Sequence, residues 1–181
     1  MSRPLGLALA IVVLSALTAA LATRAAQLPF ERVWRIADRV VLASVEEVSN
    51  RVSDGLPWTV ATLVVEETLS GFEVDRVEVA QLGGKLTTED GSTRTLSVPG
   101  LVEFQVGQRV IVALYLVAAE TPIVGVDQGY LLIGRDGRTR DAYGRPVRVA
   151  SGRSVPVEQA TEASALAEAL AEIRRILGGG S

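Results

Sequence analysis

The sequence RVIVALYLV, residues 109–117, is the strongest strand signal in the chain. After Arg109 its residues are almost all apolar, so both faces of such a strand would carry apolar side chains. A strand that is apolar on both faces needs cover on both sides and belongs in the middle of a sheet. We therefore expect residues 109–117 to lie at the centre of the fold, with a packed layer on each side.

Three further strands are predicted before this one, separated by turn residues rather than helices. In the second of them Ala61, Leu63 and Val65 recur at period two, and in the third Val77 and Val79 share one face. Glycine-containing turns at SDGLP, SG and GG end each strand. The predicted strands are residues 40–48, 58–69 and 74–82.

Residues 85–98, called the ribbon below, are predicted to form a hairpin of a different kind. Asp90-Gly91 supplies the positive φ values of a two-residue type I′ turn, which sets Thr87 opposite Arg94. Neither face of this hairpin is apolar, because Thr, Lys, Arg and Ser dominate both. The ribbon is therefore expected to project from the domain instead of joining its core.

A helix is predicted at each end of the strands. Residues 29–38 begin with a proline suited to a first helical turn. Residues 157–177 carry an apolar stripe formed by Leu166, Leu170, Ile173 and Leu177. No helix falls between consecutive strands, which disfavours a parallel sheet. The fold class expected is mainly β, a small, partly open Greek-key barrel of the oligonucleotide/oligosaccharide-binding (OB) type with a short N-terminal helix and a C-terminal amphipathic helix. An immunoglobulin-like sandwich is the alternative, and the terminal helices argue against it.

The N-terminus has the three parts of a secretory signal peptide. Arg3 precedes the apolar residues 5–22, which end in Ala-Leu-Ala, a signal-peptidase pattern. The predicted location is the periplasm or the outside of the cell, and the alternative is a membrane anchor formed by an uncleaved segment. The predicted organisation is a signal peptide at 1–22, a single barrel domain at 23–177 that includes the closing helix 157–177, and a flexible tail at 178–181.

Composition restricts the chemistry that this chain can perform. The 181 residues include no cysteine and no histidine, which removes thiol nucleophiles, thiolate metal sites and Ser-His-Asp arrangements. The formal net charge is −3, so nothing in it favours nucleic acid or an anionic membrane. We therefore expect no enzymatic activity, no cofactor, no metal, no nucleic-acid partner and no membrane insertion after signal cleavage.

The order of strand and turn signals resembles that of exported bacterial proteins of uncharacterised function. The similarity lies in ADRVVLASV at 37–45, WTVATLVVEETLSG at 58–71, VGQRV at 106–110 and QGY at 128–130. The whole is similar to the barrel of the tissue-inhibitor-of-metalloproteinases and netrin-module class, over about 38–133 plus the C-terminal helix. Inhibitors of that class place an N-terminal cysteine on the protease zinc, and this chain has none. The resemblance implies an exported barrel module that binds something, without that inhibitory mechanism.

The candidate interaction residues lie on the ribbon and at the start of one strand. Trp58 follows a glycine- and proline-containing turn, where it either offers a stacking platform for a sugar or peptide or packs at the strand end. The ribbon has two polar faces and a free outer edge that is able to accept a strand from a partner. The predicted interaction residues are Trp58, Thr87, Thr88, Glu89, Asp90 and Arg94.

Three functions remain open on the sequence alone. The first is a non-enzymatic binding or scaffold module of the cell envelope, with an envelope or extracellular protein as partner. The second is a protease-inhibitor-like protein that acts through the ribbon. The third is a hydrolase that uses Glu47 and Glu67, which requires their carboxylates to lie about 5–10 Å apart in one cleft.

Overall fold

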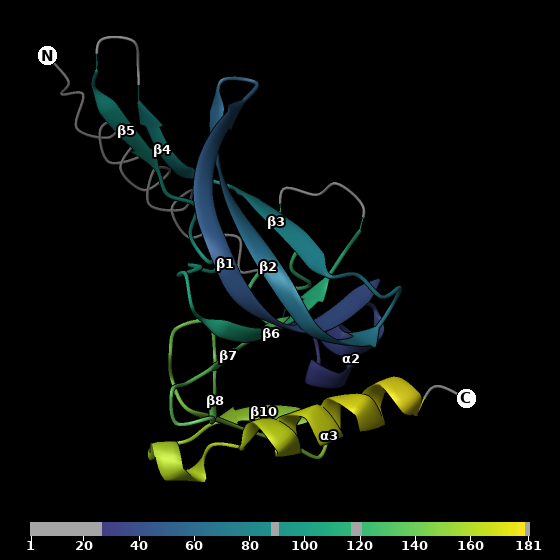
Figure 1. Cartoon of the computed structure of the whole chain (residues 1–181). Helices are drawn as coiled ribbons and strands as arrows, with labels where there is room; N and C mark the ends of the chain where they lie inside the picture. The colour runs from purple at the N-terminus through teal and green to yellow at the C-terminus, as the bar shows by residue number, and fades with distance from the viewer. Residues whose placement is uncertain (1–26, 88–90, 117–120, 180–181) are drawn as a thin grey trace, which may run out of the picture.

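One six-stranded antiparallel sheet forms the centre of the computed structural model, which describes residues 27–87, 91–116 and 121–179. Its spatial order is β3-β2-β1-β6-β7-β8 (Figure 1). The strands are β1 (Arg39–Ser53), β2 (Leu56–Ser70), β3 (Arg76–Leu82), β6 (Arg109–Leu114), β7 (Tyr130–Ile133) and β8 (Thr139–Arg140). Two small hairpins complete the strands: β4 (Gly84–Thr87) with β5 (Thr93–Leu96), and β9 (Val147–Ala150) with β10 (Arg153–Pro156).

The sheet follows Greek-key topology. Hairpins join β1, β2 and β3, and the chain then returns so that β6 pairs with the free side of β1. The sheet is open, because β3 and β8 are its two ends and do not pair with each other. The predicted mainly β class, with a helix near each end of the domain, is confirmed, and in place of the predicted partly open barrel the structure has an open sheet.

The long strands β1 and β2 curve strongly, as Figure 1 shows. Their register shifts between Val40 and Val41, between Leu42 and Ala43, and between Val45 and Glu47. Bulges of this kind bend a strand and increase its twist. Because of this curvature β1 pairs with β6 only over its first residues. The far end of β1 and the start of β2, residues 49–60, form a hairpin that is called the arm below.

The predicted central strand is covered on both faces. Ile111 and Ala113 of β6 belong to one buried cluster, which includes both helices and β9. Val110, Val112 and Leu114 belong to a second cluster with β2 and β3. The first cluster contains residues of the sheet, both helices and β9, and the second, called the concave cluster below, contains residues of β1, β2, β3 and β6 together with Val102 and Phe104.

Both predicted helices are present and shorter than expected. The helix α2 covers Phe30–Arg35, within the predicted 29–38. The helix α3 covers Leu166–Gly178, so the predicted start at residue 157 is wrong. A short 3₁₀ turn at Ala160–Glu162 precedes α3.

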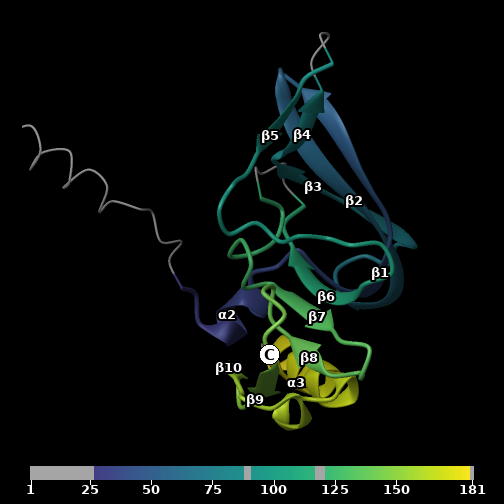
Figure 2. The same ribbon diagram turned by 90° about the vertical axis from the view of Figure 1, so that its left-hand side faces the viewer.

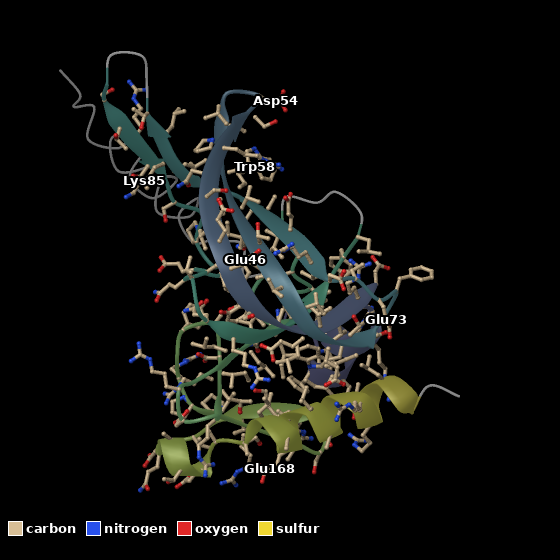
Figure 3. All side chains as sticks on the ribbon, viewed as in Figure 1. Glu46, Asp54, Trp58, Glu73, Lys85 and Glu168 are labelled. Carbon is tan, nitrogen blue, oxygen red and sulfur yellow. The ribbon has the colours of Figure 1, made fainter. Side chains whose placement is uncertain are left out.

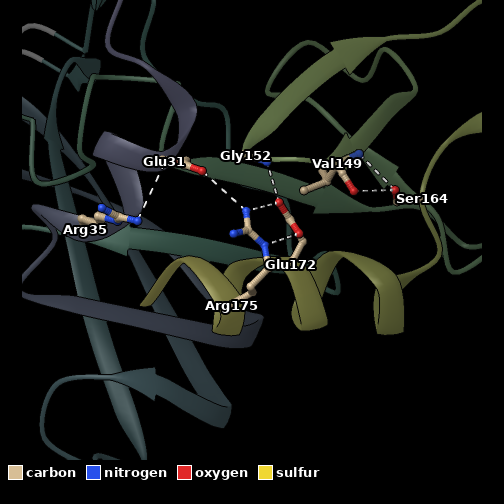
Figure 4. Close-up of polar contacts among 7 residues, drawn as sticks. All are labelled: Glu31, Arg35, Val149, Gly152, Ser164, Glu172 and Arg175. Atoms are coloured by element: carbon tan, nitrogen blue, oxygen red, sulfur yellow. Dashed lines mark hydrogen bonds and ion pairs between the residues drawn. The ribbon is translucent and has the colours of Figure 1, made fainter. Parts of the chain in front are cut away.

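Sheet-like hydrogen bonds explain the late start of α3. The amide of Ser164 donates to the carbonyl of Val147, and its own carbonyl accepts from the amide of Thr139. The hydroxyl of Ser164 also bonds both backbone groups of Val149 (Figure 4). These bonds hold the segment extended against β8 and β9, so residues before 166 do not join the helix.

A polar network joins α2, the β9–β10 turn and α3 (Figure 4). Glu172 accepts hydrogen bonds from Arg175 and from the amide of Gly152. These bonds lower the pKa of Glu172 to about 2, with Arg175 as the larger cause. Arg175 also contacts Glu31, which pairs with Arg35. The network ties the closing helix to the first helix across the end of the sheet.

The predicted signal peptide, residues 1–22, lies outside the described residues, as do the last two residues of the predicted tail. Gly178 is the last residue of α3, and Gly179 caps it. In the described part of the chain no helix combines the length and the apolar character needed to cross a bilayer.

Candidate functional site

The ribbon is an exposed two-stranded sheet formed by β4 and β5, beside the β1–β2 arm (Figure 2). Every residue of β5 is exposed. Leu86 lies opposite Arg94, and Thr87 lies opposite Thr93, so the predicted pairing of Thr87 with Arg94 is wrong by one residue. The predicted site residues Thr88, Glu89 and Asp90 lie outside the described residues.

The base of the ribbon is held tightly against the arm. The hydroxyl of Thr59 donates to the carbonyl of Gly83 at 3.0 Å. Gly84 has a φ of +132°, and a Cβ there would meet Thr59 Oγ1 at 2.8 Å and clash with Asn50. Glycine is therefore required where the chain leaves β3 and starts the ribbon.

Trp58 is half-buried on β2, on the face opposite to Thr59. Its indole Nε1 is buried and has no hydrogen-bond partner. In Figure 3, Lys85 lies on the ribbon and Trp58 on the arm. Trp58 therefore lies on β2, whereas the described candidates Thr87 and Arg94 lie on the ribbon.

A groove of about 540 Å³ lies between the ribbon, the end of β3 and the segment that leads from β5 to β6. Thr59 and Gln81 contribute from the sheet, Lys85 and Leu96 from the ribbon, and Phe104 from the segment beyond it. Such a volume falls within the range of ligand-binding clefts, about 300–1,000 Å³. Gln81 and Leu82 are the residues of β3 that line this groove, so it lies at the end of that strand.

The strand beside this groove, β3, has an open backbone edge. The Gly83 amide donates to Pro57, and the Val65 amide donates to Asp75. In an antiparallel ladder the backbone N–H and C=O groups of successive residues point alternately to the two sides of the strand. The backbone groups of the odd-numbered residues of β3 therefore point toward β2. No described residue pairs with the backbone groups on the outer side. These outward groups belong to Arg76, Glu78, Ala80 and Leu82.

Gln81 is the buried polar residue of the groove, only 2% exposed. Its side-chain Nε2 donates to the carbonyl of Val102 at 3.1 Å. Its Oε1 is buried with no hydrogen-bond partner. An unpaired buried acceptor costs free energy, which a donor from a ligand would recover.

The predicted carboxylate pair is not brought together. Glu47 lies opposite Thr62, whereas Glu67 lies opposite Leu42, five residues away along β1. At about 3.4 Å per residue this separates them by roughly 17 Å, well beyond the spacing of glycosidase carboxylates. Glu67 instead pairs with Arg174 of α3. Among the described residues no group of three or more acidic side chains is placed to hold a metal ion.

A second cleft, of about 400 Å³, lies between α2, the loops around β7 and β8, and the β9–β10 hairpin. Several of its polar groups pair with one another. Asp127 raises the pKa of Tyr143 by hydrogen bonding, and Arg145 lies 5.3 Å from the Tyr143 ring centroid. Arg145 also bonds Asp141 at 2.6 Å. The groove beside β3 is therefore the stronger candidate.

Sequence reasoning missed Gln81 and the open edge of β3. The alternation that places Val77 and Val79 on one face also places Gln81 there, as the one polar residue of an apolar series. That signal was available in the sequence, but the free edge was not, because strand order depends on distant segments. Comparison with known proteins found no matching family model, no matching curated protein and no matching solved structure.

Proposed function

We propose that this chain is an exported, non-enzymatic binding module that captures an extended segment of an envelope or extracellular protein. The observation that carries the proposal is the open edge of β3, where four residues present unpaired backbone donors and acceptors beside a groove. Strand addition uses such an edge: the main chain supplies affinity, and side-chain sites supply selectivity.

The form of this edge supports a binding role. Natural proteins commonly protect sheet edges by short strands, bulges or covering loops. The opposite edge strand, β8, has two residues and is bridged through Arg140 to Pro146. By contrast β3 has seven residues and a regular register against β2. A regular open edge of this length is a template for another strand.

Two features of the amino-acid sequence support export and a non-enzymatic role. The signal-peptide pattern at residues 1–22 supports export, and the lack of histidine and cysteine supports a role without catalysis. The resemblance to the tissue-inhibitor-of-metalloproteinases and netrin-module class, which we retain as a proposal, agrees with a module that binds other proteins.

Replacing Ala80 with proline should abolish capture and leave the fold intact. The Ala80 amide points away from β2, so Ala80→Pro removes a donor of the open edge and no bond of the β2–β3 ladder. We expect affinity for an extended peptide to fall by about tenfold or more. Selection from a displayed random peptide library, followed by titration of the selected peptides, measures this change.

Ala80→Ser is the matched control, because it alters the same side chain and keeps the amide donor. It should bind as the parent does, and both variants should melt within a few degrees of it. Amide hydrogen exchange should show new protection at β3 when peptide binds. Equal affinities for the proline and serine variants would contradict strand addition.

The ribbon supports the alternative, a protease-inhibitor-like action. All four residues of β5 are exposed, and the ribbon lies beside the β1–β2 hairpin (Figure 1). Arg94 and Thr87, two of the candidate residues, lie on the ribbon.

Replacing residues 87–94 with a short Gly-Ser linker separates the two proposals. This change keeps Lys85, Thr95 and Leu96, which line the groove. We expect unchanged peptide affinity and an unchanged melting temperature, since a polar exposed hairpin contributes little burial. Loss of capture by a folded variant would favour the ribbon as the interaction element.

A further inference from the structure

The unpaired Gln81 Oε1 favours a hydrogen-bond donor at one position of a strand that pairs with β3. Gln81 directs its backbone groups to β2, so toward the open side it occupies a non-hydrogen-bonded position. In an added antiparallel strand the side chain opposite Gln81 would lie on the same face, with Cβ atoms about 4.5–5.5 Å apart. A hydrogen-bond donor there would reach Oε1.

The neighbouring residue on the same face of β3, Val79, favours an apolar side chain in the added strand. Val79 is fully buried in the concave cluster, two residues before Gln81. The same cluster includes Val102 and Phe104 of the segment between β5 and β6. An apolar side chain opposite Val79 would extend this cluster, and a charged one would lose its solvation.

The other face of β3 carries an unmatched charge. Glu78 is exposed, and in the described part of the chain it makes no hydrogen bond or ion pair. The neighbouring acid Glu46 is already paired with Arg76 at 2.9 Å. A basic side chain opposite Glu78 would therefore complement the only acidic group on β3.

We infer that the captured strand runs antiparallel to β3 and carries a hydrogen-bond donor side chain opposite Gln81, an apolar side chain opposite Val79 and a basic side chain opposite Glu78. Read from its N-terminus, the partner segment has the order donor, any residue, apolar, basic. This inference rests on the proposed function and names the class of segment that it selects. Antiparallel pairing follows the orientation of every strand pair in the described sheet.

The test uses a blocked peptide, Thr-Val-Thr-Asn-Thr-Val-Lys-Val-Thr, and the mature chain. Its Asn, Val and Lys match the inferred order. Two control peptides replace Asn with Leu, or Lys with Glu. Titration of each peptide against the parent, Gln81→Met and Glu78→Lys measures the preferences, and hydrogen exchange at β3 locates the binding.

The parent should bind the matching peptide about tenfold more tightly than the Leu peptide, and Gln81→Met should bring that ratio close to one. Glu78→Lys, an exposed change that leaves the core intact, should reverse the preference between the Lys and Glu peptides. Reversal on this face does not depend on the packing around Gln81, so it stays informative if Gln81→Met fails to fold.

Equal affinity of the parent for all three peptides, with protection at β3, would overturn this inference and leave strand addition standing. Absence of binding and of β3 protection with every peptide, including those selected from the library, would overturn the proposed function itself. A dimer of the parent that excess peptide does not dissociate would assign the β3 edge to a second copy of this chain and overturn the inference.

Discussion

Replacing Trp34 with alanine should lower the free energy of unfolding by about 3–5 kcal/mol. Trp34 is the largest fully buried side chain, at 0% exposure, in the cluster that joins α2 and α3 to the sheet. Its ring packs edge-on against Phe30 at 5.6 Å between centroids. Chemical unfolding followed by circular dichroism measures the loss, since the substitution removes the main tryptophan probe.

Trp34→Phe is the matched control for this change. The indole Nε1 of Trp34 is buried without a hydrogen-bond partner, so phenylalanine removes an unsatisfied donor while keeping most of the apolar contact. We expect it to cost clearly less than Trp34→Ala. A loss below about 1 kcal/mol for Trp34→Ala would mean that α2 does not pack against the sheet as described.

Replacing Ile173 with alanine should lower the free energy of unfolding by about 2–5 kcal/mol. Ile173 is 0% exposed and projects from α3 into the same cluster as Trp34. The substitution leaves a cavity between helix and sheet, and the helix itself tolerates alanine well. Thermal and urea unfolding of the protein measure the effect.

Ile36→Ala provides the control with the same chemistry. Ile36 is 38% exposed and caps the end of α2, so its truncation should cost well under half as much. Similar melting temperatures for the parent and Ile173→Ala would show that the apolar face of α3 does not dock on the sheet in solution. The closing helix would then have to be assigned to a partner surface.

Periodicity predicted the parts of this fold that depend on neighbouring residues. The alternation of Ala61, Leu63 and Val65 correctly placed them on one face, where the first two are fully buried. The apolar stripe in the C-terminal segment identified Leu170 and Ile173 as buried residues of a helix. In each case the spacing of apolar residues predicts which face of the strand or helix is buried, because side-chain directions repeat every 2 residues in a strand and about every 3.6 residues in a helix.

Predictions that depended on contacts between distant segments failed. The helix was expected from residue 157, but hydrogen bonds from Ser164 to Val147 and Val149 keep residues 163–165 extended, after a short 3₁₀ turn. The hydrolase alternative required Glu47 and Glu67 to lie in one cleft, and the register of β1 against β2 separates them. The ribbon pairing was wrong by one residue, because local turn preference does not fix the register of a hairpin with two polar faces.

By itself the sequence determined a mainly β chain with a central, doubly covered strand, helices near both ends and no histidine or cysteine chemistry. These follow from side-chain period and composition, which need no knowledge of the partner segments. Only the tertiary structure decided that β3 is the open edge and that Gln81 lies in a groove beside it. The physical reason is that a backbone edge is open only when no distant strand pairs with it, and the chain's path in space sets that pairing.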